Sequence, residues 1–506
     1  MSANLKLYVM KFLLSATLAL LASFFVSAQT RDLENMAEGD MVYADILYDS
    51  DYNLYGYIYF FDQGKKDAQN KQFEYILLDR NLNKVANGTY TEKFFDGVES
   101  DFFDCTFMGD HIIFSKYFVR KYEVLLTFNR IISLENNTVS NEFIYENNAF
   151  QDLNVTEKEL KKDYRKAESI NITYAFNHKD LNGFFVTENN KKRKNSHQDK
   201  DLKIFGTDKN LKWAYVYNPD GTRKDWNDFR VLNMNEGMII GGLSHYANDI
   251  WIDSFKVVGL EMETGNKLFE YELENKNSTY SHNVNIRYFG ENIYIVGNYS
   301  PYSKEDFNWQ KNMGIYSIVL DKTGKEISKK YYPWSEIASN LEANKYGVVE
   351  KGYYLSPMKF YIMKDGSFSY LAEKFKGVNS NYTSTKSLDF VLFNFDNQGN
   401  FKENFVIEKD KTKAVKNDYL FHQYIKDNSG VVFFFRDYKK DDETRDKNWI
   451  LGINTIINGE FKQEVIPMSS DEFFIQPIPA KEGYILLREF NKKSKFDQIR
   501  LERLNY

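Results

Sequence analysis

Short hairpins that share one kind of turn recur along most of this chain, and no other feature limits its possible fold as strongly. The stretch YSIVLDKTGKEISKKYY, residues 316–332, alternates apolar and polar residues, turns at Asp321 and Gly324, and continues as a second strand. Asp caps such a turn with its side chain, and Gly tolerates the positive φ that closes it. Related hairpins occur at residues 75–90, 125–145, 204–217, 258–273, 391–407 and 449–466.

A second signal precedes these hairpins: a short turn with Gly or Asn, flanked by two strands. It is seen at residues 229–243, 286–299, 360–375, 424–435 and 478–487. The hairpin turns fall at Asp79, Leu134, Asp208, Glu263, Asp321, Asp396 and Ile457, so successive steps are 55, 74, 55, 58, 75 and 61 residues. Each step therefore has room for four strands.

Repeated four-stranded antiparallel units predict an all-β fold, a β-propeller, because stacked blades bury both faces of every sheet. Seven hairpins and a final three-strand stretch at residues 471–506 favour eight blades, with seven as the alternative and two separate β domains as the fallback. Residues 41–48, MVYADILY, are expected to supply the missing outer strand of the last blade. No shift in composition marks a linker, so residues 29–506 are predicted to form one domain.

Two short helices are expected as insertions between blades. Residues 156–169 begin with a capping box at Thr156 and Glu159, and residues 335–344 form the second candidate. The charged runs at residues 191–197 and 439–447 are interpreted as loop tips between a second and a third strand.

The first 28 residues have the form of a cleaved signal peptide. Lys6 and Lys11 precede the apolar run at residues 12–26, and small residues lead to a cleavage site before Gln29. A membrane anchor is the alternative, but the run is shorter than the roughly 20 residues of a spanning helix. We expect an exported, periplasmic or secreted bacterial protein, not a lipoprotein, with no membrane span after cleavage.

Charge and cysteine content limit the partners that the protein can bind and the interactions that can stabilise its fold. Cleavage removes two lysines and no acids, so the formal charge moves from −6 to −8, which argues against nucleic acid as a partner. The single cysteine, Cys105, excludes internal disulfides, and the core must supply the stability. We expect a monomer.

The signal peptide ending in Ser-Ala-Gln, the hydrophobic-Asp-x-x-Gly repeats and the tyrosine-rich GYIYFF at residues 56–61 resemble uncharacterised secreted propeller-type proteins of Bacteroidetes. That resemblance implies the fold and no established activity. Residues 259–273 also resemble a quinoprotein propeller repeat, but Phe269 stands where that repeat normally has tryptophan. No cofactor is expected.

Catalytic motifs are not found in the sequence. The six histidines lack the spacing of a zinc helix or finger, so no metal site is predicted. GGLSHY at residues 241–246 has Tyr246 where a nucleophile elbow needs glycine, and no phosphate-binding glycine loop occurs.

One candidate site depends on the propeller fold. If the strand before each short turn is the innermost of its blade, Arg230, Arg287 and Lys359 occupy equivalent places in three successive blades, with Gln423, Gln476 and Thr173 in the same place elsewhere. Cations and amides on one rim would bind a carboxylate or sulfate. The alternative is that these side chains pair with neighbouring acids to solvate a polar channel.

Aromatic clusters carry two interpretations. Tyr331, Tyr332 and Trp334, and the alternation of Tyr52, Tyr55, Tyr57 and Tyr59, could form a sugar-stacking surface, but such residues more often pack between sheets. Cys105 is interpreted as a small buried hydrophobe.

The sequence thus favours a non-catalytic propeller that binds an anionic small molecule, a glycan or a surface protein. The alternative is a glycan-active enzyme, a glycoside hydrolase or polysaccharide lyase, with site residues drawn from several blades. Two facing carboxylates in a central pocket, or Tyr or His beside Arg, would favour the enzyme, and a channel plugged by aromatic residues would favour the scaffold.

Overall fold

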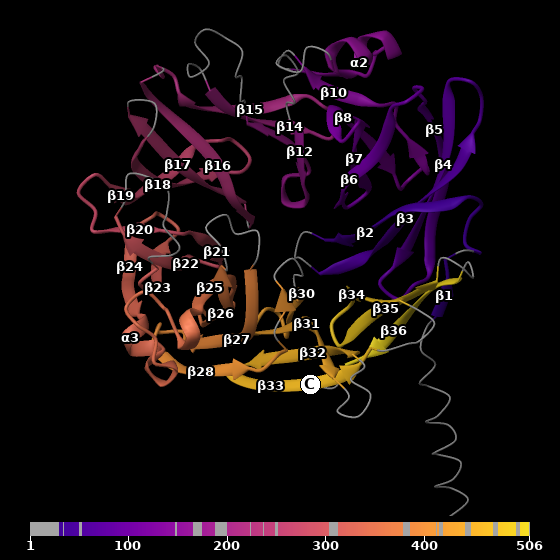
Figure 1. Ribbon diagram of the computed structural model, residues 1–506. Coiled ribbons are helices and arrows are strands. Elements are labelled where there is room, and N and C mark those ends of the chain that lie inside the picture. The colour runs from indigo at the N-terminus through magenta and orange to yellow at the C-terminus, as the bar shows by residue number, and fades with distance from the viewer. Residues whose placement is uncertain are drawn as a thin grey trace, which may run out of the picture.

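Eight antiparallel sheets follow one another around a ring in chain order, as the colours from indigo to yellow show in the computed structural model (Figure 1). The prediction of an all-β, eight-bladed propeller with two short helices is confirmed. The structure describes residues 30–33, 35–49, 53–146, 149–164, 175–187, 200–222, 224–235, 237–247, 251–302, 312–377, 385–410, 412–413, 418–440, 447–468, 474–491 and 496–504.

Blades 1 to 4 are each built from strands in sequence order. Blade 1 contains β2 (Asp40–Tyr48), β3 (Leu54–Lys65), β4 (Asn70–Asp79) and β5 (Lys84–Lys93). Blade 2 contains β6 (Glu99–Met108), β7 (His111–Arg120), β8 (Glu123–Ser133), β9 (Thr138–Val139), β10 (Phe143–Glu146) and β11 (Ala149–Asp152). Blade 3 contains β12 (Ala175–His178), β13 (Gly183–Thr187), β14 (Lys200–Gly206) and β15 (Leu211–Asn218), and blade 4 contains β16 (Asp225–Asn235), β17 (Met238–Ala247), β18 (Trp251–Glu261) and β19 (Lys267–Asn275).

Blades 5 to 7 follow the same plan, and blade 8 takes its outer strand, β1, from the start of the chain. Blade 5 contains β20 (Tyr280–His282), β21 (Asn285–Phe289), β22 (Asn292–Pro301), β23 (Gly314–Asp321) and β24 (Glu326–Pro333), and blade 6 contains β25 (Tyr354–Ile362), β26 (Phe368–Gly377), β27 (Thr385–Phe395), β28 (Phe401–Ile407) and β29 (Thr412–Lys413). Blade 7 contains β30 (Tyr419–Ile425), β31 (Gly430–Lys440), β32 (Lys447–Ile457) and β33 (Glu460–Pro467). Blade 8 contains β34 (Phe474–Pro479), β35 (Tyr484–Asn491), β36 (Phe496–Arg503) and β1 (Thr30–Asp32).

The ring closes through β1, whose Thr30–Asp32 pair with Arg500–Gln498 of β36. The expectation that residues 41–48 would be this outer strand is wrong, because they form β2, the innermost strand of blade 1. The five-residue connection to β3 is short enough to force a local hairpin with β3 instead. The three residues of β1, directly after the predicted cleavage site, carry too little pattern to be recognised as a strand.

The helical insertions lie where the sequence placed them. In α2 (Glu157–Tyr164), Thr156 N donates to Glu159 Oε2 at 2.8 Å and Glu159 N donates to Thr156 Oγ1 at 3.3 Å, so the predicted capping box is formed. The second insertion starts one residue early, as α3 (Trp334–Ile337), followed by the 3-10 turn η3 (Ser339–Leu341). Two further 3-10 turns are η1 (Lys179–Leu181) and η4 (Glu350–Gly352). Residues 165–169 and the charged run 191–197 lie outside the described residues.

The recurrent Asp turns join the third and fourth strands of the blades. In blade 5, Asp321 Oδ1 accepts hydrogen bonds from Thr323 N at 2.8 Å and Lys325 N at 3.0 Å, and Gly324 takes φ +80°. Asp79 and Asp396 are bonded in the same way. The turn chemistry read from the sequence therefore builds the outer hairpin of each of these blades.

These turns also join neighbouring blades. Trp213 Nε1, on the outer strand of blade 3, donates to Met262 O in the turn of blade 4 at 2.9 Å. Tyr332 Oη, on the outer strand of blade 5, donates to Gly399 O in the turn of blade 6 at 2.5 Å. At the closing seam, Arg31 Nε of β1 donates to Leu82 O in the turn of blade 1 at 2.8 Å. Each turn is thus fastened to the outer strand of the preceding blade.

The hydrophobic core is divided among the interfaces between blades. Phe60, Phe102 and Phe114 pack between blades 1 and 2, and Tyr361, Phe390 and Phe433 pack between blades 6 and 7. Equivalent clusters fill the other six interfaces. Trp334 and Tyr332, at 0% and 7% exposure, belong to this core, as expected for the aromatic clusters. Tyr57 and Tyr59 are also buried, and Tyr52 lies outside the described residues.

The antiparallel order of each blade places all first-to-second and third-to-fourth strand turns on one face of the ring. The connections between second and third strands, and those between blades, leave from the opposite face. No helix among the described residues is long and apolar enough to cross a membrane.

The contacts between turns and outer strands predict that alanine substitution will destabilise the protein by different amounts at two glycines of nearly equal φ. A Cβ added at Gly265 (φ +74°) would lie 2.4 Å from Trp213 Cε3, whereas at Gly109 (φ +72°) no atom lies within 4 Å. Gly109→Ala should therefore cost only the left-handed backbone strain, about 1 kcal/mol. Gly265→Ala should cost about 1 to 3 kcal/mol more, because Trp213 must move.

Urea unfolding of both variants measures this difference. Equal unfolding midpoints for Gly265→Ala and Gly109→Ala would contradict the proposed role of the turn in joining blades 3 and 4.

Candidate functional site

The strands that surround the centre of the ring are the first strands of the blades, among them β2, β16, β21, β25, β30 and β34 (Figure 1). The five candidate residues of the sequence analysis are all on such strands: Arg230 on β16, Arg287 on β21, Lys359 on β25, Gln423 on β30 and Gln476 on β34. Thr173 lies outside the described residues. The assignment of the innermost strand, on which the candidate site depended, is therefore correct.

The five residues do not lie at the same position along the channel axis. Arg287 and Gln423 lie opposite the third residues of their partner strands, Tyr294 and Val432, and Lys359 lies opposite the fourth, Leu371. Arg230 and Gln476 lie opposite the fifth residues, Gly242 and Arg488. Two residues of a strand span about 7 Å, so Arg230 and Gln476 are displaced along the channel from Arg287.

Strand bulges also alter the register. In β16 the pairing skips Leu232, which lies between Arg230 and the turn, so counting residues back from the turn gives the wrong partner for Arg230. In β25 the pairing skips Met358, which lies on the far side of Lys359 from the turn, so the register of Lys359 is unaffected. Arg230 is largely exposed, at 76% of its side chain, and its Nε lies 3.6 Å from Asp228 Oδ2.

Arg287 and Lys359 are brought together around three residues of β30. The Arg287 guanidinium lies 4.3 Å from the centre of the Tyr424 ring, and Lys359 Nζ lies 5.9 Å from the centre of the Tyr419 ring. His422 Nδ1 and Tyr419 Oη are hydrogen-bonded at 2.9 Å. We call Arg287, Lys359, Tyr419, His422 and Tyr424 the channel cluster.

The channel cluster needs the bulge in β30. Tyr419 pairs with Phe435, Phe421 with Phe434 and His422 with Phe433, so the pairing skips Leu420. That extra residue puts Tyr419 on the same side of the strand as His422, although they are three positions apart. Gln423 points to the other side, where its Nε2 donates to Ala480 O of blade 8 at 3.1 Å.

The charged residues of the channel cluster are both cations, and they affect the pKa values of their neighbours. Burial, and then the charges of Lys359 and Arg287, lower the pKa of His422 from 6.5 to about 4, so the imidazole is neutral near pH 7. Burial raises the pKa of the Tyr424 phenol, an effect that Arg287 opposes. Among the described residues, no carboxylate lies within ion-pair distance of Arg287 or Lys359.

His422, Tyr419 and Tyr424 were not among the predicted site residues, because the spacing of the histidines along the sequence matches no metal site. The only available signal was their position beside Gln423 on an inner strand. Strict alternation would have grouped Tyr419 with Gln423 rather than with His422, so the bulge hid the cluster.

Two neighbouring inner strands also carry carboxylates, Asp45 on β2 and Asp104 on β6. Burial raises the pKa of both, and the charge of Asp45 adds to the effect on Asp104. Asp45 accepts from Tyr43 Oη at 2.8 Å, Ile46 N at 2.8 Å and Cys105 N at 3.0 Å. The bond from Cys105 N joins blade 2 to blade 1, and Asp45 serves as a structural acceptor. Cys105 itself is buried, as predicted.

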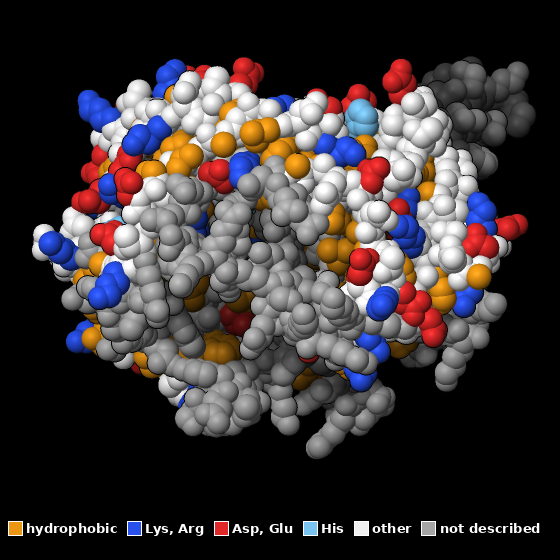
Figure 2. All heavy atoms as spheres, turned by 90° about the horizontal axis from the view of Figure 1, so that it is seen from above, with side chains coloured by type: hydrophobic (Ala, Val, Ile, Leu, Met, Phe, Trp, Pro, Cys, Tyr) orange, Lys and Arg blue, Asp and Glu red, His pale blue; other side chains and the backbone are white. Residues whose placement is uncertain are grey.

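The described part of the face drawn in Figure 2 shows no patch of a single charge. Figure 2 shows Lys and Arg interspersed with Asp, Glu and hydrophobic side chains over the described part of that face. Within the described ranges, no group of three or more His, Cys, Asp or Glu residues is placed to hold a metal ion. The interior of the ring is therefore the better candidate for a binding site.

Comparison with known proteins gives the family and the fold. The sequence matches the family of unknown function DUF6770 over residues 9–417, about four fifths of the chain. The protein belongs to this family. No curated protein matches the sequence.

Solved structures resemble this chain only distantly. The propeller domain of the Trilobed protease from Pyrococcus furiosus is 9% identical (TM-score 0.33; 82% of this chain and 97% of that chain). The arabinofuranosidase Arb93A from Fusarium graminearum is 11% identical (TM-score 0.29; 63% and 89%). The WD40 domain of SCAP from fission yeast is 9% identical (TM-score 0.28; 94% and 94%). At these values the likeness carries no inference about activity.

The lowered pKa of His422 predicts how the free energy of unfolding depends on pH. The folded state keeps His422 neutral down to about pH 4, while the unfolded chain binds a proton below about pH 6.5, so stability falls as the pH falls through this window. Between about pH 6.5 and about pH 5 this residue should contribute a loss of about 2 kcal/mol. His422→Gln should remove that part of the pH dependence.

The measurement is urea unfolding at about pH 7 and about pH 5, with His111→Gln as the control, since His111 bonds Asp110 at the surface. His178, whose pKa burial also lowers to about 4, remains in both variants and should retain part of the slope. An unchanged pH dependence in His422→Gln would show that the channel cluster does not suppress protonation of this imidazole.

Proposed function

We propose that the protein is an exported, ligand-binding propeller whose channel cluster binds the carboxylate or sulfate groups of an acidic glycan. The observation that carries the proposal is that Arg287 and Lys359 converge on one neutral histidine with no described carboxylate as a counter-ion. Export is proposed from the signal sequence at residues 1–28.

The geometry of Arg287 suits recognition of an anion. Its guanidinium carbon lies 4.3 Å from the centre of the Tyr424 ring and 5.2 Å from the centre of the Phe289 ring. An arginine held by cation–π contacts still has N–H groups along the edge of the guanidinium plane for hydrogen bonds to a ligand. A carboxylate or sulfate can accept two parallel hydrogen bonds from such an edge. Lys359 adds a second positive charge from the next blade, and partial burial strengthens both interactions.

Charge reversal at one cation tests the proposal. Arg287→Glu removes a charge-assisted hydrogen bond and adds repulsion, together about 3 kcal/mol, which corresponds to about a hundredfold increase in Kd. The probes are tetragalacturonate for carboxylate and a heparin tetrasaccharide for sulfate, measured by isothermal titration calorimetry at low ionic strength.

Lys462→Glu, an equal change of charge at an exposed position on β33, is the matched control and should leave Kd within about twofold. Failure of both probes to bind the unaltered protein, or equal effects of the two variants, would reject the channel cluster as an anion site.

A second candidate, a polysaccharide lyase, is favoured by the presence of His422 beside Arg287. In β-elimination, two cations neutralise the carboxylate of a uronate and a base removes the proton at C5. His422 would take that proton, the C4–C5 double bond would form as the C4–O bond breaks, and the leaving oxygen would take a proton from water. A carboxylate between the cations would raise the basicity of the imidazole.

Ultraviolet absorbance of the unsaturated product separates the two candidates. If the protein is a lyase, incubation with polygalacturonate should increase the absorbance, and His422→Gln should abolish the increase while Kd for tetragalacturonate stays within about threefold. Binding without any increase in absorbance would establish a binding protein and exclude the lyase.

A further inference from the structure

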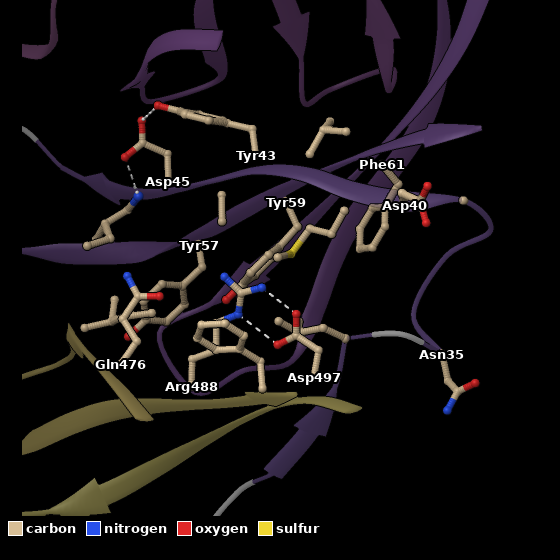
Figure 3. A pocket seen from close by; sticks show the side chains of 18 of the residues that line it. Asn35, Asp40, Tyr43, Asp45, Tyr57, Tyr59, Phe61, Gln476, Arg488 and Asp497 are labelled. Atoms are coloured by element: carbon tan, nitrogen blue, oxygen red, sulfur yellow. Dashed lines mark hydrogen bonds and ion pairs between the residues drawn. The ribbon is translucent and has the colours of Figure 1, made fainter. Parts of the chain in front are cut away.

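A cavity lies away from the channel cluster, at the seam where blade 8 meets blade 1. It has a volume of about 1120 Å³ and is lined by residues of β2 and β3 on one side and of β34, β35 and β36 on the other. We call it the seam cleft. Figure 3 shows Tyr59 and Phe61 on one wall, facing Gln476, Arg488 and Asp497 on the other.

The seam cleft exists because only half of this interface is packed. Near the turns, Ile478, Leu486 and Ile499 of blade 8 pack with Tyr57 and other apolar residues of blade 1. Further along the same face of blade 8, the side chains become Gln476, Arg488 and Asp497. This change from aliphatic to polar residues on one sheet face opens the cleft.

Flat groups of blade 8 lie next to one another at the seam cleft: Phe490 and Arg488 line the cleft, and Phe474 packs against Phe490. Phe474 is 68% exposed, and its ring lies 5.5 Å from that of Phe490 at an interplanar angle of 28°. The Arg488 guanidinium lies 5.0 Å from the Phe490 ring on the way to Asp497. Exposure of the Phe474 ring to water is unfavourable, because the ring is apolar. A ligand with a flat apolar face would cover the ring.

The charge of the seam cleft differs from that of the channel cluster. Its single lining cation among the described residues, Arg488, is neutralised by two hydrogen bonds to Asp497, from Nε to Oδ1 at 2.8 Å and from Nη2 to Oδ2 at 2.5 Å. Asp40 is exposed at the rim, and Asp45 also belongs to the lining. An anionic ligand would therefore be repelled.

Three other polar side chains of the seam cleft can form hydrogen bonds with a ligand. Gln476, exposed on β34, offers an amide donor and acceptor, Asp40 offers a carboxylate acceptor, and Asn35 adds a second amide at the rim. Aromatic faces with amides and carboxylates at their edges match the apolar faces and hydroxyl rims of sugar rings. We infer that the seam cleft binds a neutral oligosaccharide, independently of the proposed anion site.

The test uses the full mature protein and four neutral probes, cellotetraose, xylotetraose, mannotetraose and maltotetraose, with Kd measured by isothermal titration calorimetry. At least one probe should bind. Phe474→Ala and Gln476→Ala, both at exposed positions that do not endanger folding, should each raise its Kd at least tenfold. Tetragalacturonate should not compete with the neutral probe.

Tyr122→Ala, which removes a fully exposed aromatic side chain in the turn between β7 and β8, is the matched control and should not change Kd. Arg287→Glu should also leave neutral-sugar binding unchanged, so failure of the anion site and failure of the seam cleft are distinguishable. Absence of binding by all four probes, or binding that Phe474→Ala and Gln476→Ala leave unaltered, overturns the inference.

Discussion

The repeats are held in a ring by hydrophobic packing between blades, and at three junctions the third-to-fourth-strand turn of one blade is also hydrogen-bonded to the outer strand of the preceding blade. Trp213, Tyr332 and Arg31 each donate a hydrogen bond to a turn carbonyl of the following blade. The same bond therefore recurs at the closing seam, where the outer strand comes from the other end of the chain. Glycine in the turn serves this contact as well as the positive φ, because a side chain at Gly265 would meet Trp213.

The turns and the closing strand differ in how far their structure could be predicted from the sequence. Asp321 and Gly324 belong to a local turn whose chemistry depends only on neighbouring residues, so spacing along the sequence predicts the hairpins, the blades and the order of strands. The closing strand is different. Thr30–Asp32 are held by β36 and by the turn at Leu82, both distant in sequence, and a three-residue strand has no pattern of its own.

The candidate site was predictable only in part, for a related reason. Inner strands of the described blades bulge at Leu232, Met358 and Leu420, and each bulge moves the following residues to the other side of the strand. The sequence therefore placed Arg287 and Lys359 correctly on the inner strands, yet it could not show that His422 faces them while Gln423 faces blade 8. Bulges depend on packing around the channel, which no local pattern specifies.

The propeller thus has two chemically distinct regions on different inner strands: the channel cluster on β21, β25 and β30, and the seam cleft on β2 and β34. Where Arg287 and Lys359 meet, desolvation keeps His422 neutral, so the cations are left as the only charges in the channel cluster. Where β34 faces β2, the one cation is neutralised by Asp497 and aromatic faces dominate. If both proposed sites bind sugars, a polymer that carries acidic and neutral sugars gains affinity through effective concentration only where its length spans the distance between the two regions.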